Sequence, residues 1–220
     1  MTPSFWAFPS PMSRIISVNV GEPRTVEFRG RTVSTGIYKF PVEGPVRVEG
    51  VNLVRDHQAD RRVHGGVHKA VYAYASEDYE WWSGQLGRTL PPGMFGDNLT
   101  TEGIDVGRSV IGQHWGIGDV VLEVSEPRVP CYKLGIRMED PEFPALFSAA
   151  QRPGTYLRIV EEGSLTAGDR IEIGAAPSHG LTVADIARIH YRDHHEAGRI
   201  LEASGLSDPW KRWARRFAEV

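Results

Sequence analysis

Glycine and proline recur along this chain and divide it into short runs of β-forming residues. The 24 glycines and 15 prolines leave few stretches long enough for one extended regular element. The runs 14–20, 25–28 and 31–33 contain the β-branched and aromatic residues typical of strands. Short strands separated by turn-forming residues predict an antiparallel barrel or sandwich rather than a doubly wound sheet.

Further strands and one hairpin follow from the same pattern. Arg29-Gly30 is expected to form the turn between two of the strands. The run 70–75, Ala-Val-Tyr-Ala-Tyr-Ala, is apolar throughout and predicts a buried strand. We expect a strand at 169–173 to pair with one at 156–160 across Glu162-Gly163. The remaining expected strands are 46–48, 51–54 and 119–124.

Helical patterns occur once early in the chain and three times near its end. Ser76 is expected to cap the early helix, which Gly87 ends, with Tyr79 and Trp82 on the buried side. After Pro177, helical spacing appears at 182–190, 193–204 and 208–217. We therefore predict a mainly β fold with a few helices, divided into a loose arm (1–13), a barrel (14–176) and a three-helix appendage (177–220).

The last of these helices carries a basic face. Lys211, Arg212, Arg215 and Arg216 are spaced to lie opposite its apolar residues. Such a charge run is typical of a solvated helix face, and the alternative is a docking surface for an acidic partner.

Composition limits the classes of protein to which the chain can belong. Its 40% hydrophobic and 24% charged residues are ordinary for a soluble globular protein. A net charge of −3 gives no reason to expect nucleic acid as a general partner. No apolar run approaches the ~20 residues needed to span a bilayer, and the start does not resemble a signal peptide. With a single cysteine, the chain is expected in a reducing, cytoplasmic compartment, without membrane association.

That cysteine, Cys131, lies between two cations. Arg128 precedes it and Lys133 follows it, and nearby positive charge favours the thiolate that serves as nucleophile or metal ligand. Pro127 and Pro130 are expected to keep the segment out of regular strand pairing. An inert core cysteine is the alternative, because unpaired cysteines are often buried.

Two other segments carry polar side chains beside glycines. The segment 58–69 includes Arg61, Arg62, His64, Gly65, Gly66, His68 and Lys69. Basic groups around glycines suit an anionic ligand such as phosphate, and the alternative is a polar surface turn. The segment 92–100 offers the Asn98 amide beside Gly96, where the alternative is a turn closed by Asp97 or Asn98 itself.

Together these three blocks resemble the MOSC family, the domain found at the C-terminus of molybdenum-cofactor sulfurases. The blocks are Gln58 to Val71, Phe95 to Leu99 and Pro127 to Leu134. Their order and spacing resemble its stand-alone bacterial branch, the YiiM-like proteins linked to resistance to N-hydroxylated purines. Arg55 stands where that branch often has glycine, and Asp97 stands where glutamate is commoner. The resemblance implies a β-barrel fold with a three-helix C-terminal appendage.

The resemblance also implies a molybdopterin cofactor whose molybdenum is bound by Cys131. His64 and Lys133 would assist catalysis at the metal. The other residues of the blocks would hold the cofactor, with phosphate contacts among them: Arg128, Lys69, Asn98, Arg61, Arg62, His68, Gly65 and Gly66. A dithiolene that occupies part of the coordination sphere would explain a site with only one cysteine.

From this resemblance we predict an oxidoreductase that reduces N-hydroxylated bases or similar compounds to amines. Its electrons would come from a separate flavin- or NAD(P)H-dependent protein. One alternative is a module that carries the cofactor, or a persulfide on Cys131, without turnover. Another is a cysteine hydrolase in which His64, His68 or His114 activates the thiol. Exposed strand edges and the aromatic arm from Phe5 to Phe8 also predict a homodimer.

Overall fold

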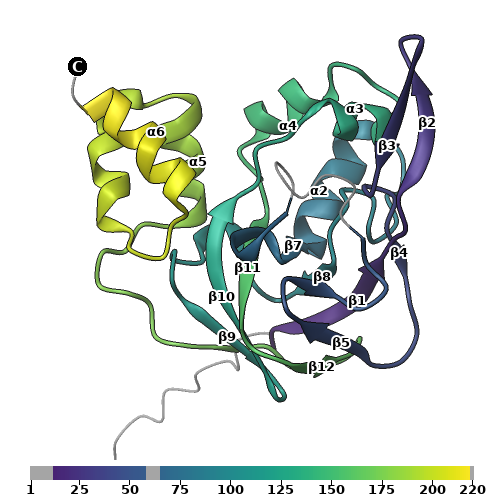
Figure 1. The fold of residues 1–220 in the computed structure, drawn as a ribbon, viewed down its shortest axis with the longest axis horizontal. Coiled ribbons are helices and arrows are strands. Elements are labelled where there is room, and N and C mark those ends of the chain that lie inside the picture. Colours follow the sequence, from purple (N-terminus) through teal and green to yellow (C-terminus); the bar gives the residue numbers. More distant parts are fainter. Residues whose placement is uncertain (1–11, 58–64, 219–220) are drawn as a thin grey trace, which may run out of the picture.

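The computed structural model describes residues 12–57 and 65–218. Its main feature is a curled, half-barrel sheet of eight strands with helices packed around it (Figure 1). The strands follow the order β13 (Glu172–Ile173), β9 (His114–Ile117), β10 (Val120–Pro127), β11 (Thr155–Glu161), β7 (Val71–Ala75), β8 (Leu99–Glu102), β1 (Arg14–Val20) and β4 (Phe40–Pro41).

Two smaller sheets complete the β-structure of the described residues. One contains β12 (Gly163–Leu165), β5 (Val46–Glu49) and β6 (Asn52–Leu53). The other is the expected hairpin of β2 (Arg24–Phe28) and β3 (Arg31–Thr35), whose strands pair only with each other. The hairpin turn contains Arg29 and Gly30, both with positive φ, which confirms the turn predicted there.

Strand β7 is buried on both faces, as its apolar run predicts. Tyr72 and Tyr74 point into one core, whereas Val71, Ala73 and Ala75 belong to the other. The tyrosine side is covered by the helices α2 (Ser76–Leu86), α3 (Tyr132–Met138) and α4 (Phe143–Ala150). A central strand with a core on each side needs no polar face, which explains the continuous run of apolar residues.

The sheet is mixed rather than wholly antiparallel. β7 and β8 run parallel, with Ala73 opposite Leu99, and α2 lies in the connection between them. A parallel pair requires such a crossover, whereas antiparallel neighbours can be joined by a short turn. The early helix was predicted from its residues, but the crossover it makes depends on tertiary packing.

Two local predictions were wrong. The strand at 169–173 does not pair with β11. Residues 169–171 bond to the start of β1 and the residue before it, β13 pairs with β9, and β11 lies between β10 and β7. Ser76 does not cap α2, because the N-cap position is Ala75 and the Ser76 hydroxyl bonds to Glu77. Gly87 does end this helix in the left-handed conformation.

The chain after Pro177 is helical. It forms α5 (Val183–Tyr191), the 3₁₀ helix η3 (His194–Glu202) and α6 (Asp208–Ala218). Thr182 and Asp185 make the reciprocal hydrogen bonds of the predicted capping box. Ile186, Ile200 and Ala214 belong to the same buried cluster as the barrel strands. The division into a barrel and a separate appendage remains a prediction. Of the predicted arm 1–13, residues 1–11 lie outside the described residues.

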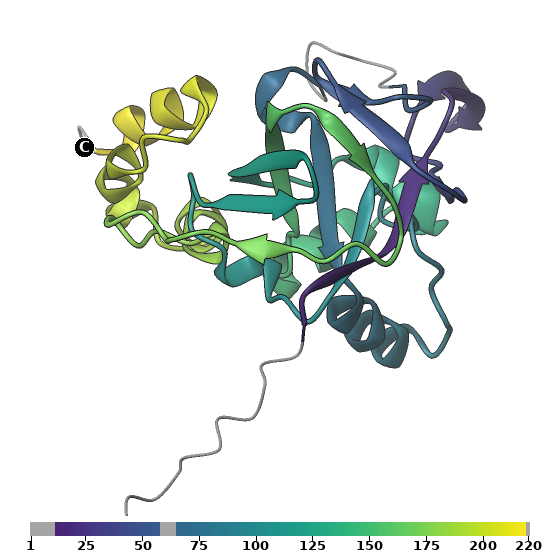
Figure 2. The same cartoon turned by 90° about the horizontal axis from the view of Figure 1, so that it is seen from below.

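The two views place the C-terminal helices and the β2–β3 hairpin at opposite ends of the molecule (Figures 1 and 2). Short 3₁₀ helices η1 (Val67–Lys69) and η2 (Val106–Arg108) lie in connections. Within the described residues, every helix is too short or too polar to cross a bilayer.

Candidate functional site

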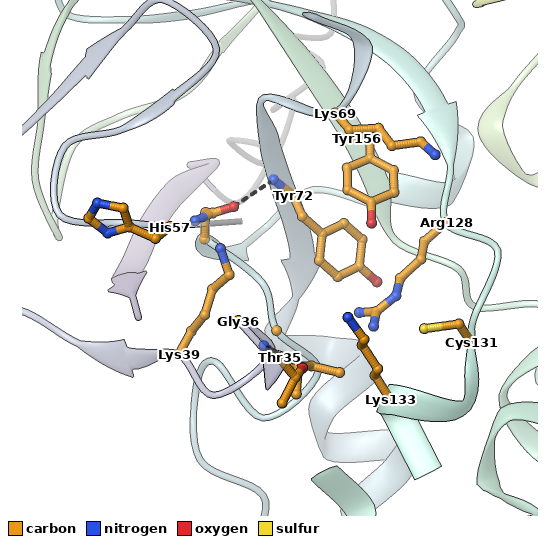
Figure 3. Close-up of a pocket in the computed structure, with 13 residues that line it drawn as sticks. Thr35, Gly36, Lys39, His57, Lys69, Tyr72, Arg128, Cys131, Lys133 and Tyr156 are labelled. Carbon is orange, nitrogen blue, oxygen red and sulfur yellow. Dashed lines mark hydrogen bonds between the residues drawn. The ribbon is translucent and has the colours of Figure 1, made fainter. Parts of the chain in front are cut away.

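Cys131 lies at a pocket that combines parts of the chain far apart in sequence (Figure 3). The pocket contains about 600 Å³ of empty space, part of it open to solvent. Its lining, which we call the Cys131 pocket, consists of Thr35, Gly36, Ile37, Lys39, His57, Lys69, Tyr72, Gly96, Asn98, Arg128, Cys131, Lys133 and Tyr156.

The cysteine loop joins β10 to α3. Pro127 is the last residue of β10 and pairs with Thr155, so the expectation that it lies outside regular pairing was wrong. Pairing with β9 ends at Glu123, so this end of β10 has a partner on one side only and tolerates a proline. Cys131 is the N-cap residue of α3, and it is half-buried rather than sealed in the core.

Arg128 is the buried cation of the site. Its guanidinium donates a hydrogen bond to the Phe95 carbonyl oxygen and lies 4.9 Å from the centroid of the Tyr72 ring. Burial by itself would lower the pKa of Arg128, but its interactions with Tyr72, Tyr156 and Cys131 outweigh burial and raise the pKa. Arg128 therefore remains charged and is held in one orientation by stacking and a hydrogen bond.

Two tyrosines form the back of the pocket. Tyr72 and Tyr156 have ring centroids 5.0 Å apart, and the Tyr72 hydroxyl donates to the Pro153 carbonyl oxygen at 2.7 Å. Burial raises the pKa of both phenols, and the charge of Arg128 opposes this only in part. Both rings are therefore neutral donors at ordinary pH.

Lys39 and Asp56 form a buried ion pair on the opposite wall from Arg128, Cys131 and Lys133 (Figure 3). The Asp56 carboxylate also accepts from the backbone N–H of Gly21 at 3.0 Å. Burial lowers the pKa of Lys39, while Asp56 and Asp97 act to raise it. An ion pair at this depth is stable only because further hydrogen bonds satisfy the carboxylate.

Asn98 lines the pocket, but its amide bonds to the protein. Its Oδ1 accepts from the N–H of Tyr72 at 3.1 Å, and its Nδ2 donates to Asp56 and to the Asn19 carbonyl oxygen. The two N–H donors are thus both used within the fold. Asn98 therefore joins β7, β1 and the Lys39–Asp56 pair. We expect it to contribute to ligand binding by fixing the positions of these groups.

Two neighbours of Asn98, Asp97 and Gly96, also have structural roles in this segment. The Asp97 carboxylate accepts from the Tyr79 hydroxyl at 2.5 Å and from Thr100 Oγ1 at 2.7 Å. Burial raises the pKa of Asp97, and these hydrogen bonds oppose the shift. Gly96 has φ of 73°, and an added Cβ would lie 2.9 Å from Cγ1 of Ile37, another lining residue of the pocket. Glycine is therefore required here both by conformation and by space.

The His-Gly-Gly block is described in part. Lys69 lines the pocket, with Nζ 3.5 Å from Glu126 Oε1 and 5.9 Å from the Tyr156 ring centroid. His68 is outside the lining set, and its Nδ1 lies 2.9 Å from Ser125 Oγ. Gly65 and Gly66 are not among the lining residues either. The expected contacts of Arg61, Arg62 and His64 lie outside the described residues.

Several lining residues were not anticipated from the sequence. Lys39, His57 and the segment 35–37 stand outside any motif, and nothing in their local sequence marks them. For Tyr72 and Tyr156, the sequence pattern predicts only a place in a strand. One usable signal was the alternation Val-Tyr-Ala-Tyr in a buried strand, since buried tyrosines need a hydrogen-bond partner.

The electrostatic character of the lining is cationic. It contains Lys39, Lys69, Arg128 and Lys133 and, among the described residues, no carboxylate. Behind the lining, Asp56 pairs with Lys39, and Glu126 lies 3.5 Å from Lys69. Within 12–57 and 65–218 there is also no cluster of three or more His, Cys, Asp or Glu able to hold a metal. A bound group with donor atoms of its own would supply further ligands to a metal at Cys131. An anionic dithiolene cofactor with a phosphate fits this set of donors and charges.

Comparisons with known proteins identify the family of the chain. Residues 60–172 match the model of the MOSC domain. The chain is 34% identical to the uncharacterized protein YflK of Bacillus subtilis, over 90% of each chain. It is also 31% identical to a protein named Reductase from Gibberella moniliformis. That match spans 73% of this chain and 29% of the Gibberella protein.

A solved structure shows the same fold. The crystal structure of YiiM from Geobacillus stearothermophilus superposes with a TM-score of 0.77 at 29% identity, covering 93% of this chain and 98% of that one. The family match includes the cysteine loop and most of the lining residues. The chain therefore belongs to the MOSC family, in its YiiM-like branch.

Proposed function

We propose that this protein is a molybdenum-cofactor-dependent reductase that converts N-hydroxylated bases or related compounds to amines. The observation that carries the proposal is the position of Cys131. The only cysteine of the chain borders a pocket whose lining includes Arg128 and Lys133, together with Lys39 and Lys69, which have carboxylates behind them, and no carboxylate among the described residues. Such a pocket attracts an anionic group and offers it one soft ligand.

The residues of the pocket divide into holding and reacting groups. Cys131 Sγ would bind the metal, and Arg128 and Lys69 would hold the anionic part of the cofactor. The stacked, buried guanidinium of Arg128 is already oriented before any ligand arrives, which lowers the cost of binding. When bound, the cofactor would supply the redox chemistry. Lys133 and His64 would stabilise negative charge and donate a proton to the leaving oxygen.

A separate electron donor is part of the proposal. The relative named Reductase is much longer than this chain, which covers 29% of it. That length leaves room in the relative for further domains fused to the MOSC segment. We infer that this chain obtains electrons from an independent flavin- or NAD(P)H-dependent protein. A homodimer and a cytoplasmic location remain predictions.

The cofactor is tested by elemental analysis. Wild type, Cys131→Ser and the control Val129→Ala are made in cells that synthesise the molybdenum cofactor. Val129 is an exposed neighbour in the same loop, so its truncation tests for disturbance of the loop alone. We expect molybdenum in wild type and control and none in Cys131→Ser. Equal molybdenum in all three proteins, or none in wild type, contradicts the proposal.

Turnover separates the reductase from the carrier. The loaded protein is supplied with a flavin-dependent donor and an N-hydroxylated purine, and amine formation is measured. Bound molybdenum without turnover on any N-hydroxylated compound favours a carrier of cofactor or sulfur. Activity in metal-free protein that Cys131→Ala abolishes favours a cysteine hydrolase.

A further inference from the structure

Two aromatic side chains from distant parts of the chain meet beside the Cys131 pocket. Phe28 ends β2, and Tyr132 directly follows Cys131. Their ring centroids lie 5.9 Å apart, with 28° between the ring planes. Even with this stacking, 50% of the Tyr132 surface stays exposed. An aromatic surface next to the thiol is therefore open to solvent.

The hairpin that carries Phe28 is anchored by other contacts. The Arg24 guanidinium lies 5.5 Å from the Tyr38 ring centroid and 4.8 Å from that of Phe40. Arg137 of α3 lies 4.9 Å and 5.8 Å from the same two rings. These cation–π contacts tie the hairpin to α3 without Phe28. The Phe28–Tyr132 stack is therefore an additional contact, available for another role.

The aromatic pair joins two segments of the chain, the β2–β3 hairpin and the cysteine loop, that each lead into lining residues of the pocket. β3 ends at Thr35, and Thr35, Gly36 and Ile37 line one side. Tyr132 adjoins Cys131, which lines the other side (Figure 3). Neither Phe28 nor Tyr132 is itself a lining residue. Tyr132 lies in the chain between the lining residues Cys131 and Lys133 and is half exposed, so a ligand that projects out of the pocket on this side would meet its ring.

We propose that Phe28 and Tyr132 select substrates by stacking on a flat heteroaromatic ring, such as a purine. This inference rests on the proposed reductase function and assigns its substrate preference to named residues. The cations inside the pocket attract any anionic or polar group, whether flat or not. An aromatic face, in contrast, attracts a planar ring far better than a branched aliphatic group. Such a contact changes affinity by roughly two- to tenfold.

The pterin of the cofactor is also a planar heteroaromatic ring, so it is the other group that could stack on this pair. We assign the pair to the substrate because of its position. A cofactor held by Arg128 and Lys69 lies within the pocket, whereas the pair lies outside the lining. If the pair binds the substrate, a mutation in it lowers the preference for a purine. If the pair binds the pterin, the mutation lowers the cofactor content, so one experiment distinguishes the two.

The test uses holoenzyme and two N-hydroxylated substrates, a purine and an acyclic aliphatic hydroxylamine. The variants are Phe28→Ala, Tyr132→Ala and Tyr132→Phe. Phe217→Ala is the control, because Phe217 is an exposed aromatic on α6, at the far end of the molecule from the hairpin (Figure 1). Each alanine variant in the pair is expected to lower the purine-to-aliphatic ratio of kcat/KM by roughly three- to tenfold. Tyr132→Phe and the control should keep the wild-type ratio.

Other outcomes overturn the proposal. Equal losses for both substrates show that the pair only supports the loop. Loss of pterin and molybdenum from Tyr132→Ala assigns the ring to the cofactor. If wild type reduces neither substrate, the reductase proposal fails, and calorimetric binding of the purine still tests the pair. Weaker purine binding by the alanine variants then supports the stack, and unchanged binding contradicts it.

Discussion

Asn98 Nδ2 donates a 2.9 Å hydrogen bond to Oδ2 of Asp56 inside the wall of the Cys131 pocket. This bond joins a residue of a family motif to a carboxylate that no motif includes. The same carboxylate forms the ion pair with Lys39. The amide thus contributes to the site by holding a buried charge in place, and the first prediction tests that arrangement.

Asp56→Ala should destabilise the protein strongly. It leaves the Lys39 ammonium buried without its counter-charge, and such a loss costs about 3–5 kcal/mol. The control is Glu49→Ala, which removes the partner of Arg47 in an exposed ion pair, with side chains 49% and 57% exposed. That change should cost less than about 1 kcal/mol. Urea unfolding of both variants measures the difference, and similar losses would show that the buried pair contributes little.

His190 should make the stability of the C-terminal helices depend on pH. Burial lowers its pKa from the usual 6.5, with a further lowering by His194, and the rings of Trp210 and Trp213 pack on it. A lowered folded pKa means that the unfolded chain binds the proton more readily. Stability is therefore complete above pH 6.5 and falls as the pH decreases below it.

The His190 prediction is measured by tryptophan fluorescence during urea unfolding at about pH 8 and about pH 5.5. His190→Phe should lose part of the pH dependence that wild type shows. His195→Gln is the control, because this histidine is exposed in the following 3₁₀ helix. A pH dependence that is unchanged by His190→Phe would contradict the assignment.

Arg55→Gly should stabilise the protein. Arg55 is exposed and has φ of 72°, a left-handed conformation at the position where the branch often has glycine. A non-glycine residue there carries about 1–2 kcal/mol of strain, and the greater chain entropy of glycine offsets about 0.5–1 kcal/mol of the gain. We expect a net gain of roughly 0.5–1 kcal/mol in thermal or chemical unfolding. Arg47→Gly, in the extended strand β5, should instead destabilise.

Gly96→Ala should disturb the pocket wall. Both Gly96 and the control Gly50 have positive φ, at 73° and 60°, so alanine strains both. Only Gly96 has a neighbour within 4 Å of the added Cβ, at Ile37. Gly96→Ala should therefore cost about 1–3 kcal/mol more than Gly50→Ala. The comparison also predicts reduced cofactor loading in Gly96→Ala alone, measured as bound molybdenum per chain.

Strands and caps that depend on local residues were predictable. The run 14–20 forms β1 with the expected bounds, and Thr182 and Asp185 make the expected capping box. The alternation of side chains in a strand and the hydrogen bonds of a helix cap both depend only on residues a few positions apart. Pairing between distant strands was not predictable in the same way. Of the run 169–173, Glu172 and Ile173 pair with β9, a partner that no local signal identifies.

The candidate site shows the same division. The cysteine loop could be recognised because Arg128, Cys131 and Lys133 stand close together in sequence and carry complementary chemistry. Lys39 could not be recognised, because its role depends on Asp56 and on a wall formed by the sheet. Asn98 was identified from its motif, but the structure shows that its amide bonds to the fold.

By itself, the sequence determined the family, the short strands, the helical C-terminal segments and the thiol with its adjacent cations. These depend on residue type and on spacing over a few positions. Tertiary structure alone decided the parallel β7–β8 pair, the second wall of the pocket and the meeting of Phe28 with Tyr132. Such contacts join residues distant in sequence, and they form because many small packing energies together offset the entropy of closing long loops.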